Sequence, residues 1–316
     1  MPRERGESLQ WGMYLSHYGL AEPPFAITPD PRFVFLGERH RDALAHLMYG
    51  IGQGGSGGFV QLTGEVGTGK TTLCRLALEQ LPDNVRVALV LNPKQTPLEL
   101  VESICEELQV PPSSRRRSLK SRIDELNDFL LNAYAKGLRV VLIIDEAQEL
   151  SRELLEQVRL LTNLETPTQK LLQIVLLGQP ELRETLARPA LRQLAQRITA
   201  RFHLAPLQAA DTAAYLRHRI TVAGASVFPF DEGAVRRLHA LSGGVPRLLN
   251  VLGDRALLAG YVHGRARVAA KLVDLAASEV LPQQVSDGRA WRMLGWCLVL
   301  AGAALVWIAL GLRGIG

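Results

Sequence analysis

Cysteine is scarce in this chain: three occur in 316 residues, at Cys74, Cys105 and Cys297. They lie far apart, with no CxxC pair and no histidine at metal-ligand spacing, so the sequence predicts neither a disulfide framework nor a zinc site. The seven histidines likewise form no ligand pattern. A reducing compartment is the simpler interpretation.

An apolar leader is also lacking, because residues 1–10 are polar and charged and no apolar stretch follows them. We therefore expect no cleavable secretory signal. Charged residues make up 21% and hydrophobic residues 47% of the chain, which is ordinary for a globular protein. The net charge of +5 suits an anionic partner such as nucleic acid, a phospholipid surface or a nucleotide, and does not choose among them.

Long apolar runs are lacking except for one near the C-terminus, at residues 293–312. Its about 20 uncharged residues are enough for a helix to cross a bilayer. Arginines bracket the run and tryptophans could anchor it at the interfaces: Arg289, Arg292, Arg313, Trp291, Trp296 and Trp307. We expect one transmembrane helix here, after a polar linker at residues 281–292, with a buried core helix as the alternative.

The rest of the chain alternates between two hydrophobic patterns. Short apolar runs rich in β-branched residues predict strands at residues 59–63, 85–91, 139–144, 171–177 and 200–204. Apolar residues at helical spacing predict helices at residues 39–50, 97–108, 119–136 and 151–164. Strands that alternate with helices predict an α/β fold with a doubly wound, parallel, five-stranded sheet.

Two further regions flank this α/β core. Residues 15–36 are rich in proline and aromatic residues, so we expect an ordered, non-helical segment that leads into the core. Beyond residue 207 the strand pattern ends, and helices are predicted at residues 209–223, 231–241, 245–260 and 268–280. The predicted order is an N-terminal segment (1–36), a core (37–206), a helical lid (207–280), the linker (281–292) and the membrane helix (293–312).

The strongest motif is GEVGTGKT at residues 64–71, which fits G-x-x-x-x-G-K-[ST] and lies between a predicted strand and a helix-forming run. It predicts a phosphate-binding loop, because its glycines let backbone N–H groups wrap the phosphates and the helix N-terminus adds positive potential. Lys70 would reach the β- and γ-phosphates, and Thr71 would give its hydroxyl to Mg²⁺. The predicted ATP-binding residues of the loop are Gly64, Glu65, Val66, Gly67, Thr68, Gly69, Lys70, Thr71 and Thr72.

A second motif, VVLIIDEAQ at residues 140–148, predicts a buried strand that carries two carboxylates at its C-terminal end. Open α/β sheets bind ligands at that end. Asp145 would hold Mg²⁺ together with Thr71, and Glu146 would orient and deprotonate the attacking water. The two motifs together predict hydrolysis of Mg-ATP.

With these motifs, LLGQPEL (176–182), LAQRITARFHL (194–204) and GGVPRLLN (243–250) resemble the AAA+ superfamily of P-loop NTPases. More narrowly, HYGLAEPPFAITPDPRFVFLGERHRDAL (17–44) is similar to the general secretion pathway protein A family and its pilus- and exopolysaccharide-locus relatives. The resemblance covers residues 13–280. Longer members carry a periplasmic peptidoglycan-binding domain beyond the membrane helix, and this sequence departs from them by stopping at Gly316.

The resemblance also assigns three more residues. Gln179, after the fourth strand, matches sensor 1, which contacts the γ-phosphate or the attacking water. Arg197 matches the arginine finger that a neighbouring subunit supplies, and Arg201 is the near alternative for that role. The alternative for Arg197 itself is a structural role, as a helix-terminal arginine that compensates the helix dipole. Arg247 matches sensor 2, which reaches the γ-phosphate from the lid, with a capping or surface arginine as its alternative.

The resemblance implies a homo-oligomeric ring, anchored in the inner membrane near its C-terminus, with the ATPase body in the cytoplasm. It would hydrolyse ATP to help assemble an envelope secretion, pilus or exopolysaccharide export system, with proteins of that system as partners. A nucleic-acid-dependent ATPase such as a transposition regulator is the alternative, because it shares the core motifs and the chain is basic; the apolar run at 293–312 disfavours it. The arginines at residues 115–117 could contact DNA or acidic lipid, but a solvated loop is the interpretation we favour.

Overall fold

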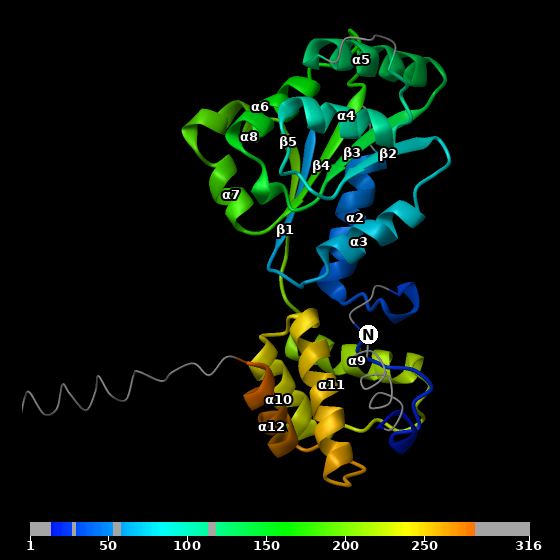
Figure 1. The fold of residues 1–316 in the computed structure, drawn as a ribbon, viewed down its shortest axis with the longest axis vertical. Helices are drawn as coiled ribbons and strands as arrows, with labels where there is room; N and C mark the ends of the chain where they lie inside the picture. The colour runs from blue at the N-terminus through cyan, green and yellow to red at the C-terminus, as the bar shows by residue number, and fades with distance from the viewer. Residues whose placement is uncertain (1–13, 27–29, 53–57, 113–117, 282–316) are drawn as a thin grey trace, which may run out of the picture. The chain divides into compact units, whose positions relative to one another are not determined.

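The computed structural model describes residues 14–26, 30–52, 58–112 and 118–281. Its core contains a sheet of five strands in the order β2-β3-β4-β1-β5, and all neighbouring strands are parallel (Figure 1). The strands are β1 (Phe59–Gly64), β2 (Val85–Val90), β3 (Arg139–Ile144), β4 (Leu172–Gly178) and β5 (Ile198–Leu204). The predicted parallel, five-stranded α/β sheet is therefore confirmed.

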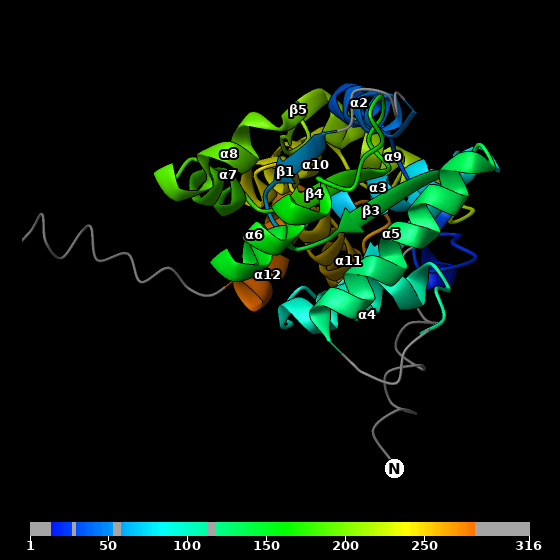
Figure 2. The same cartoon turned by 90° about the horizontal axis from the view of Figure 1, so that it is seen from above.

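Helices cover both faces of this sheet, as a doubly wound fold requires (Figure 2). The core helices are α2 (Glu38–Gly52), α3 (Lys70–Glu79), α4 (Pro97–Glu107), α5 (Leu119–Ala135), α6 (Arg152–Leu161), α7 (Glu181–Leu186) and α8 (Arg192–Gln196). Leu142 and Ile144 of β3 pack in the cluster with α4, α5, α6, α7 and α8, whereas Val141 and Ile143 pack in the cluster with α2 and α3. This alternation follows from the two-residue period of a strand.

Side-chain caps explain where several of these helices begin. Thr96 accepts a hydrogen bond from the backbone N–H of Glu99, whose carboxylate accepts one from the backbone N–H of Thr96, so α4 begins with a capping box. Ser118 and Ser151 cap α5 and α6 in the same position. Helices α7 and α8 are six and five residues long, too short for a repeating pattern, and the sequence did not predict them.

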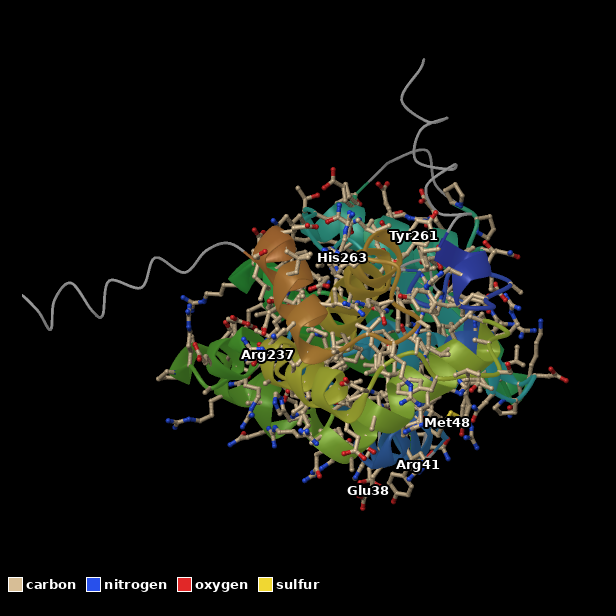
Figure 3. The ribbon with its side chains drawn as sticks, turned by 90° about the horizontal axis from the view of Figure 1, so that it is seen from below. Glu38, Arg41, Met48, Arg237, Tyr261 and His263 are labelled. Atoms are coloured by element: carbon tan, nitrogen blue, oxygen red, sulfur yellow. The ribbon has the colours of Figure 1, made fainter. Side chains whose placement is uncertain are left out.

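Among the described residues, four helices follow β5: α9 (Ala209–Val222), α10 (Glu232–Ser242), α11 (Pro246–Val262) and α12 (Ala270–Val280). Each overlaps a helix predicted from the sequence. Arg237 of α10 donates a hydrogen bond from Nε to Asp274 of α12 at 2.5 Å. Figure 3 shows Arg237 on this helical region, with Tyr261 and His263 at the end of α11 and with Glu38, Arg41 and Met48 on α2.

The N-terminal segment differs from its prediction, because residues 14–17 form a helical turn and Pro31–Phe33 a 3₁₀ helix, η1. It packs on the helices that follow β5. Tyr14 donates its hydroxyl hydrogen bond to Asp254 of α11 at 2.7 Å, and the backbone N–H of Ala21 donates to the carbonyl of Ala223 at 2.8 Å. The segment is thus part of the packing of the helical region, a role that its local sequence did not predict.

Several predicted features lie outside the described residues. These are the membrane helix at 293–312, the linker apart from Leu281, and the basic run at 115–117. Within the described ranges, no helix combines the length and the apolar character needed to cross a bilayer. The described residues up to Ala276 form one compact unit, and a division of the chain into two units falls after Ala276. Cys74 and Cys105 are buried free thiols.

Gly244, in the GGVPR motif, is held by a close backbone contact. It has a φ of +76°, and its carbonyl accepts a hydrogen bond from the backbone N–H of Leu207 at 2.9 Å. A Cβ atom added at Gly244 would lie 2.0 Å from the carbonyl oxygen of Leu207. The connection between β5 and α9 therefore packs directly on the turn that begins α11.

We expect Gly244→Ala to lower the free energy of unfolding by about 3 kcal/mol or more, because it adds a backbone clash to the strain of a left-handed residue. Gly264→Ala is the matched control, since Gly264 has a φ of +61° and nothing within 4 Å of an added Cβ. The control should lose only about 1 kcal/mol. Denaturant unfolding of both variants tests this, and equal losses would contradict the clash.

Candidate nucleotide-binding site

The GEVGTGKT loop joins β1 to α3 at the C-terminal edge of the sheet. Gly67 and Gly69 have φ angles of 81° and 100°, which L side chains rarely adopt. The hydroxyl of Thr68 donates to the carbonyl of Glu65 at 2.9 Å and holds the turn closed. The first residue of α3, Lys70, directly follows Gly69, so the free N–H groups of the helix N-terminus face the loop. This geometry suits an oxyanion such as phosphate.

Lys70 is buried, with 6% of its surface exposed. Its ammonium donates hydrogen bonds to the carbonyls of Gly64 at 2.7 Å and Glu65 at 3.0 Å. Burial lowers the pKa of Lys70, while the carboxylates of Glu146 and Asp145 act in the opposite direction. Carbonyl oxygens are weaker partners for an ammonium than phosphate oxygens are, so the loop holds a cation ready for an anionic ligand.

Thr71 and Asp145 meet beside Lys70. The hydroxyl of Thr71 donates to Asp145 Oδ2 at 2.6 Å, and Asp145 Oδ1 accepts the backbone N–H of Glu146 at 2.8 Å. Asp145 is 4% exposed. Oxygen donors of this kind fit Mg²⁺, which takes one or two protein ligands and completes its shell with phosphates and water. Among the described residues, no group of three or more His, Cys, Asp or Glu side chains could hold a metal ion alone.

Glu146 follows Asp145 with a φ of 50°, in the left-handed region. Its Oε2 accepts hydrogen bonds from Gln148 Nε2 at 2.7 Å and from Gln179 Nε2 at 3.3 Å. The backbone N–H of Gln179 donates to Gln148 Oε1 at 2.9 Å. The structure therefore brings Glu146 and Gln179 together. Gln148 was not among the predicted site residues, although a polar amide two residues after Glu146 was a usable signal.

A cavity of about 400 Å³ opens beside the loop and is lined partly by residues that the sequence had not assigned. Glu146 and the loop residues from Val66 to Thr72 line one part of it. The N-terminal segment adds Phe33, Val34, Phe35 and Leu36, α2 adds His40, and the helices after β5 add Tyr215, Arg219, Arg247 and Asn250. The aromatic character of residues 25–35 was the signal for this part of the site.

Arg219 fastens the N-terminal segment to α9 at this cavity. It is 7% exposed, and its guanidinium donates to the carbonyls of Pro24 at 2.5 Å and Ala26 at 3.0 Å. The same group lies 4.9 Å from the ring centroid of Phe33, within the range of a cation–π interaction. The hydroxyl of Tyr215 donates to Asn250 at 2.6 Å and links α9 to α11. Phe33 and Phe35 form an aromatic wall of the cavity. A buried polar network thus holds the segment that carries this aromatic wall.

His40 supports the loop from the other side. It is buried, its Nε2 lies 3.1 Å from the carbonyl oxygen of Thr68, and burial lowers its pKa. The imidazole is therefore neutral near pH 7, with Nε2 as the donor to Thr68. This contact ties the first turn of α2 to the phosphate-binding loop.

Arg247 lies next to the loop, at the start of α11. Its backbone N–H donates to the carbonyl of Gly67 at 3.2 Å, and a Cβ added at Gly67 would lie 2.6 Å from the Cβ of Arg247. The side chain lines the cavity. The absence of a side chain at Gly67 thus permits the close approach of α11 to the loop.

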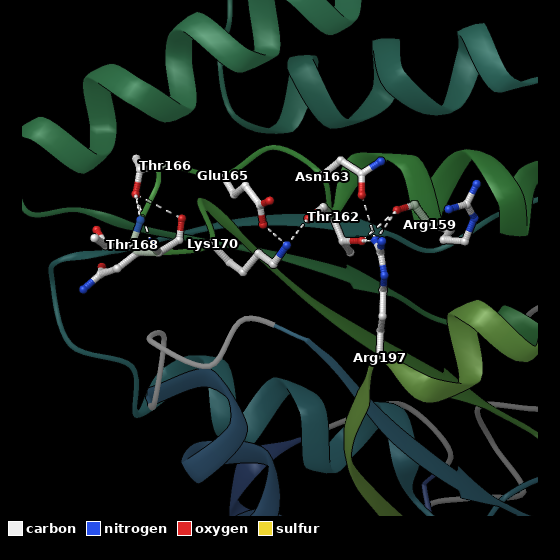
Figure 4. A network of polar contacts seen from close by, with 9 residues as sticks. Arg159, Thr162, Asn163, Glu165, Thr166, Thr168, Lys170 and Arg197 are labelled. Atoms are coloured by element: carbon white, nitrogen blue, oxygen red, sulfur yellow. Dashed lines mark hydrogen bonds and ion pairs between the residues drawn. The ribbon is translucent and has the colours of Figure 1, made fainter.

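Arg197 lies away from these groups, at the opposite edge of the sheet. Its carbonyl accepts the N–H of Phe59, at the start of β1, whereas the loop follows the end of β1. Its guanidinium donates to the carbonyl of Arg159 at 3.2 Å, to Asn163 at 2.9 Å and to the hydroxyl of Thr162 (Figure 4). These acceptors belong to the end of α6, a different helix from α8, which Arg197 itself follows. Within one chain, Arg197 does not join the nucleotide site.

This chain is similar to known proteins over the region that contains the candidate site. A family model described as an AAA domain matches residues 53–186, which contain both predicted motifs. General secretion pathway protein A of Aeromonas hydrophila is 50% identical over 294 residues, covering 93% of this chain and 53% of that protein. The chain therefore spans about half the length of this relative.

Solved structures with 17–20% identity share the fold. Cdc6p from Pyrobaculum aerophilum has a TM-score of 0.67 at 20% identity, over 84% of this chain and 73% of that chain. The Aeropyrum pernix ORC2 protein in its ADPNP-ADP complexes has a TM-score of 0.60 at 19% identity, over 84% and 73%. The Thermotoga maritima RuvB Holliday junction branch migration motor has 0.52 at 18%, over 78% and 70%. Together, the domain match and the 50% identity over 93% of this chain identify it as a relative of general secretion pathway protein A that carries an AAA domain.

Proposed function

We propose that this chain binds Mg-ATP at residues 64–72 and hydrolyses it, with Glu146 as the general base. The observation that carries the proposal is the meeting of three groups at one edge of the sheet. Lys70 supplies a buried cation, Thr71 and Asp145 supply paired oxygens, and Glu146 supplies a second carboxylate in the same cavity. Each group has a distinct task in phosphoryl transfer.

Lys70 would exchange its carbonyl partners for the β- and γ-phosphate oxygens and neutralise their charge. Thr71 and Asp145 would hold Mg²⁺, which neutralises charge on the phosphates when bound. Glu146 would take a proton from water as the water oxygen attacks the γ-phosphorus and the bond to the β-phosphate oxygen breaks. A carboxylate outside the Thr71–Asp145 pair is suited to that task, because it is not occupied by the metal.

Three residues would assist this reaction. Gln179 would contact the γ-phosphate or the water, and its hydrogen bond to Glu146 supports that position. Arg247 would reach the γ-phosphate from the helical lid, and its place on the cavity wall supports this. Arg197 would act on a neighbour's site as the finger of a homo-oligomeric ring, since it does not reach the site of its own chain.

The proposed biological role is assembly of an envelope secretion, pilus or exopolysaccharide export system at the inner membrane. It is supported by the 50% identity to general secretion pathway protein A of Aeromonas hydrophila. The proposed anchor is the apolar run at residues 293–312, which would place the ATPase body in the cytoplasm. Proteins of the export system are the partners we infer.

We expect Lys70→Ala to weaken ATP binding by about 100-fold or more, because it removes a buried charge that pairs with phosphate. Glu146→Gln should bind ATP normally and lose hydrolysis by about 100-fold or more, because an amide cannot accept the proton. Nucleotide affinity and phosphate release separate the two effects. Glu149→Gln is the matched control, since Glu149 is exposed and paired with Lys94. Normal hydrolysis by Glu146→Gln would refute the assignment of the base.

A mixing experiment tests the role of Arg197. Arg197→Ala should be inactive alone and should regain hydrolysis when mixed with Lys70→Ala, because one variant keeps an intact loop and the other an intact finger. Arg197→Ala should also melt at a lower temperature, since the end of α6 loses donors that stabilise it by about 1–2 kcal/mol. Mixing is therefore done below both melting temperatures. If Arg201→Ala is the variant that is inactive alone and regains hydrolysis with Lys70→Ala, the arginine finger is Arg201 and not Arg197.

Cell fractionation tests the proposed anchor. The full chain should sediment with membranes, and a chain that ends at Asp287 should remain in the supernatant with its ATPase activity, because no proposed catalytic residue lies beyond α12. Protease added to intact spheroplasts should leave the body uncut until the membrane is permeabilised. A full chain found in the supernatant would refute the anchor and favour a nucleic-acid-dependent ATPase.

A further inference from the structure

Gln148 has a fixed orientation between two strand ends. It lies in η2 (Ala147–Glu149), two residues beyond β3, and its Oε1 accepts the backbone N–H of Gln179, the residue that follows β4. A backbone N–H can only donate, so the oxygen of the Gln148 amide must face β4. The amide nitrogen must then face the other way, where it donates to Glu146 Oε2 at 2.7 Å.

The backbone of β4 makes room for this amide. A Cβ atom added at Gly178 would lie 2.9 Å from Gln148 Oε1, closer than real Cβ contacts. The same Cβ would also lie 2.9 Å from Leu182, so Gly178 keeps both side chains close to the strand. The position of Gln148 is therefore set by two strands, and not only by its own turn.

Glu146 needs such support because its own backbone does not define where its carboxylate points. It is an exposed side chain with three rotatable bonds, on a residue with a φ of 50°. A general base acts only when its oxygen lies within hydrogen-bond reach of the water, about 2.6–3.2 Å. Two amide donors on a single oxygen, from Gln148 and Gln179, restrict the carboxylate to one direction.

We propose that Gln148 is a positioning residue for ATP hydrolysis: it holds Oε2 of Glu146, so that the second carboxylate oxygen accepts the proton of the attacking water. The inference rests on the proposed function of Glu146 as the general base. It adds a link between the base and β4, because the amide that holds Glu146 is itself held by the backbone of Gln179. A shift of Gln179 on contact with the γ-phosphate would thus move the base as well.

Three substitutions of Gln148 separate its two hydrogen bonds. Gln148→Glu keeps an oxygen acceptor for the N–H of Gln179 and replaces the donor to Glu146 by a like charge. Gln148→Met keeps the length of the side chain and removes both bonds. Gln148→Asn keeps the amide on a shorter side chain. Gln193→Ala, at an exposed glutamine of α8, is the matched control.

We expect Gln148→Glu and Gln148→Met to lower kcat by about 10- to 100-fold, as a misplaced catalytic group does, while the KM and Kd for ATP stay within about twofold. Gln148→Asn should retain more activity than Gln148→Met. In a Glu146→Gln background, Gln148→Met should have no further effect, because a positioning residue has nothing left to position. A purely structural role predicts parallel losses in ATP affinity, melting temperature and kcat.

Each other outcome decides against the inference. An unchanged or higher kcat in Gln148→Met means that Gln148 does not position the base, or that it restrains it. Additive losses in the double variant mean that Gln148 acts through another group. If Glu146→Gln itself hydrolyses ATP normally, the proposed function fails first; if that variant is inactive and Gln148→Met is active, only the present inference fails.

Discussion

The parallel pairing of β1, β3 and β4 is the constraint on which the rest of the site depends. β4 lies between the other two, and its last residue, Gly178, pairs with Thr63, the residue before the phosphate-binding loop. Because parallel strands end at the same edge, the loop after β1, the carboxylates after β3 and Gln179 after β4 must converge. Segments about 80 and 30 residues apart in sequence thereby form one site.

This convergence brings together polar side chains that form hydrogen bonds with one another and with the loop. Lys70 is held by loop carbonyls, Thr71 by Asp145, and Glu146 by two amides. A buried ammonium that rests on neutral carbonyls is stabilised further by an anion, and this favours phosphate binding. In the proposed binding of ATP, Lys70 would therefore exchange its carbonyl contacts for contacts with phosphate.

The helices after β5 reach this edge through backbone contacts, which explains the glycines found there. Arg247 approaches Gly67, and Leu207 approaches Gly244, at separations that no side chain would permit. The N-terminal segment adds the aromatic wall and is held by Arg219. A ligand in the cavity would touch the core, α2, the N-terminal segment and α11 together, so nucleotide binding is suited to couple these parts.

The sequence by itself determined the five strands, most helices and the GEVGTGKT loop between β1 and α3, because these depend on local hydrophobic periods and on one contiguous motif. Tertiary structure alone decided what touches that loop. The contacts of Phe33 and Arg219 with the cavity, and the hold of Gln148 on Glu146, join residues from separate elements. The position of Arg197 at the end of α6 likewise depends on how α6 packs beside the start of β5. Local patterns specify which element a residue belongs to; which side chains meet is set by strand order and by packing, to which the whole chain contributes.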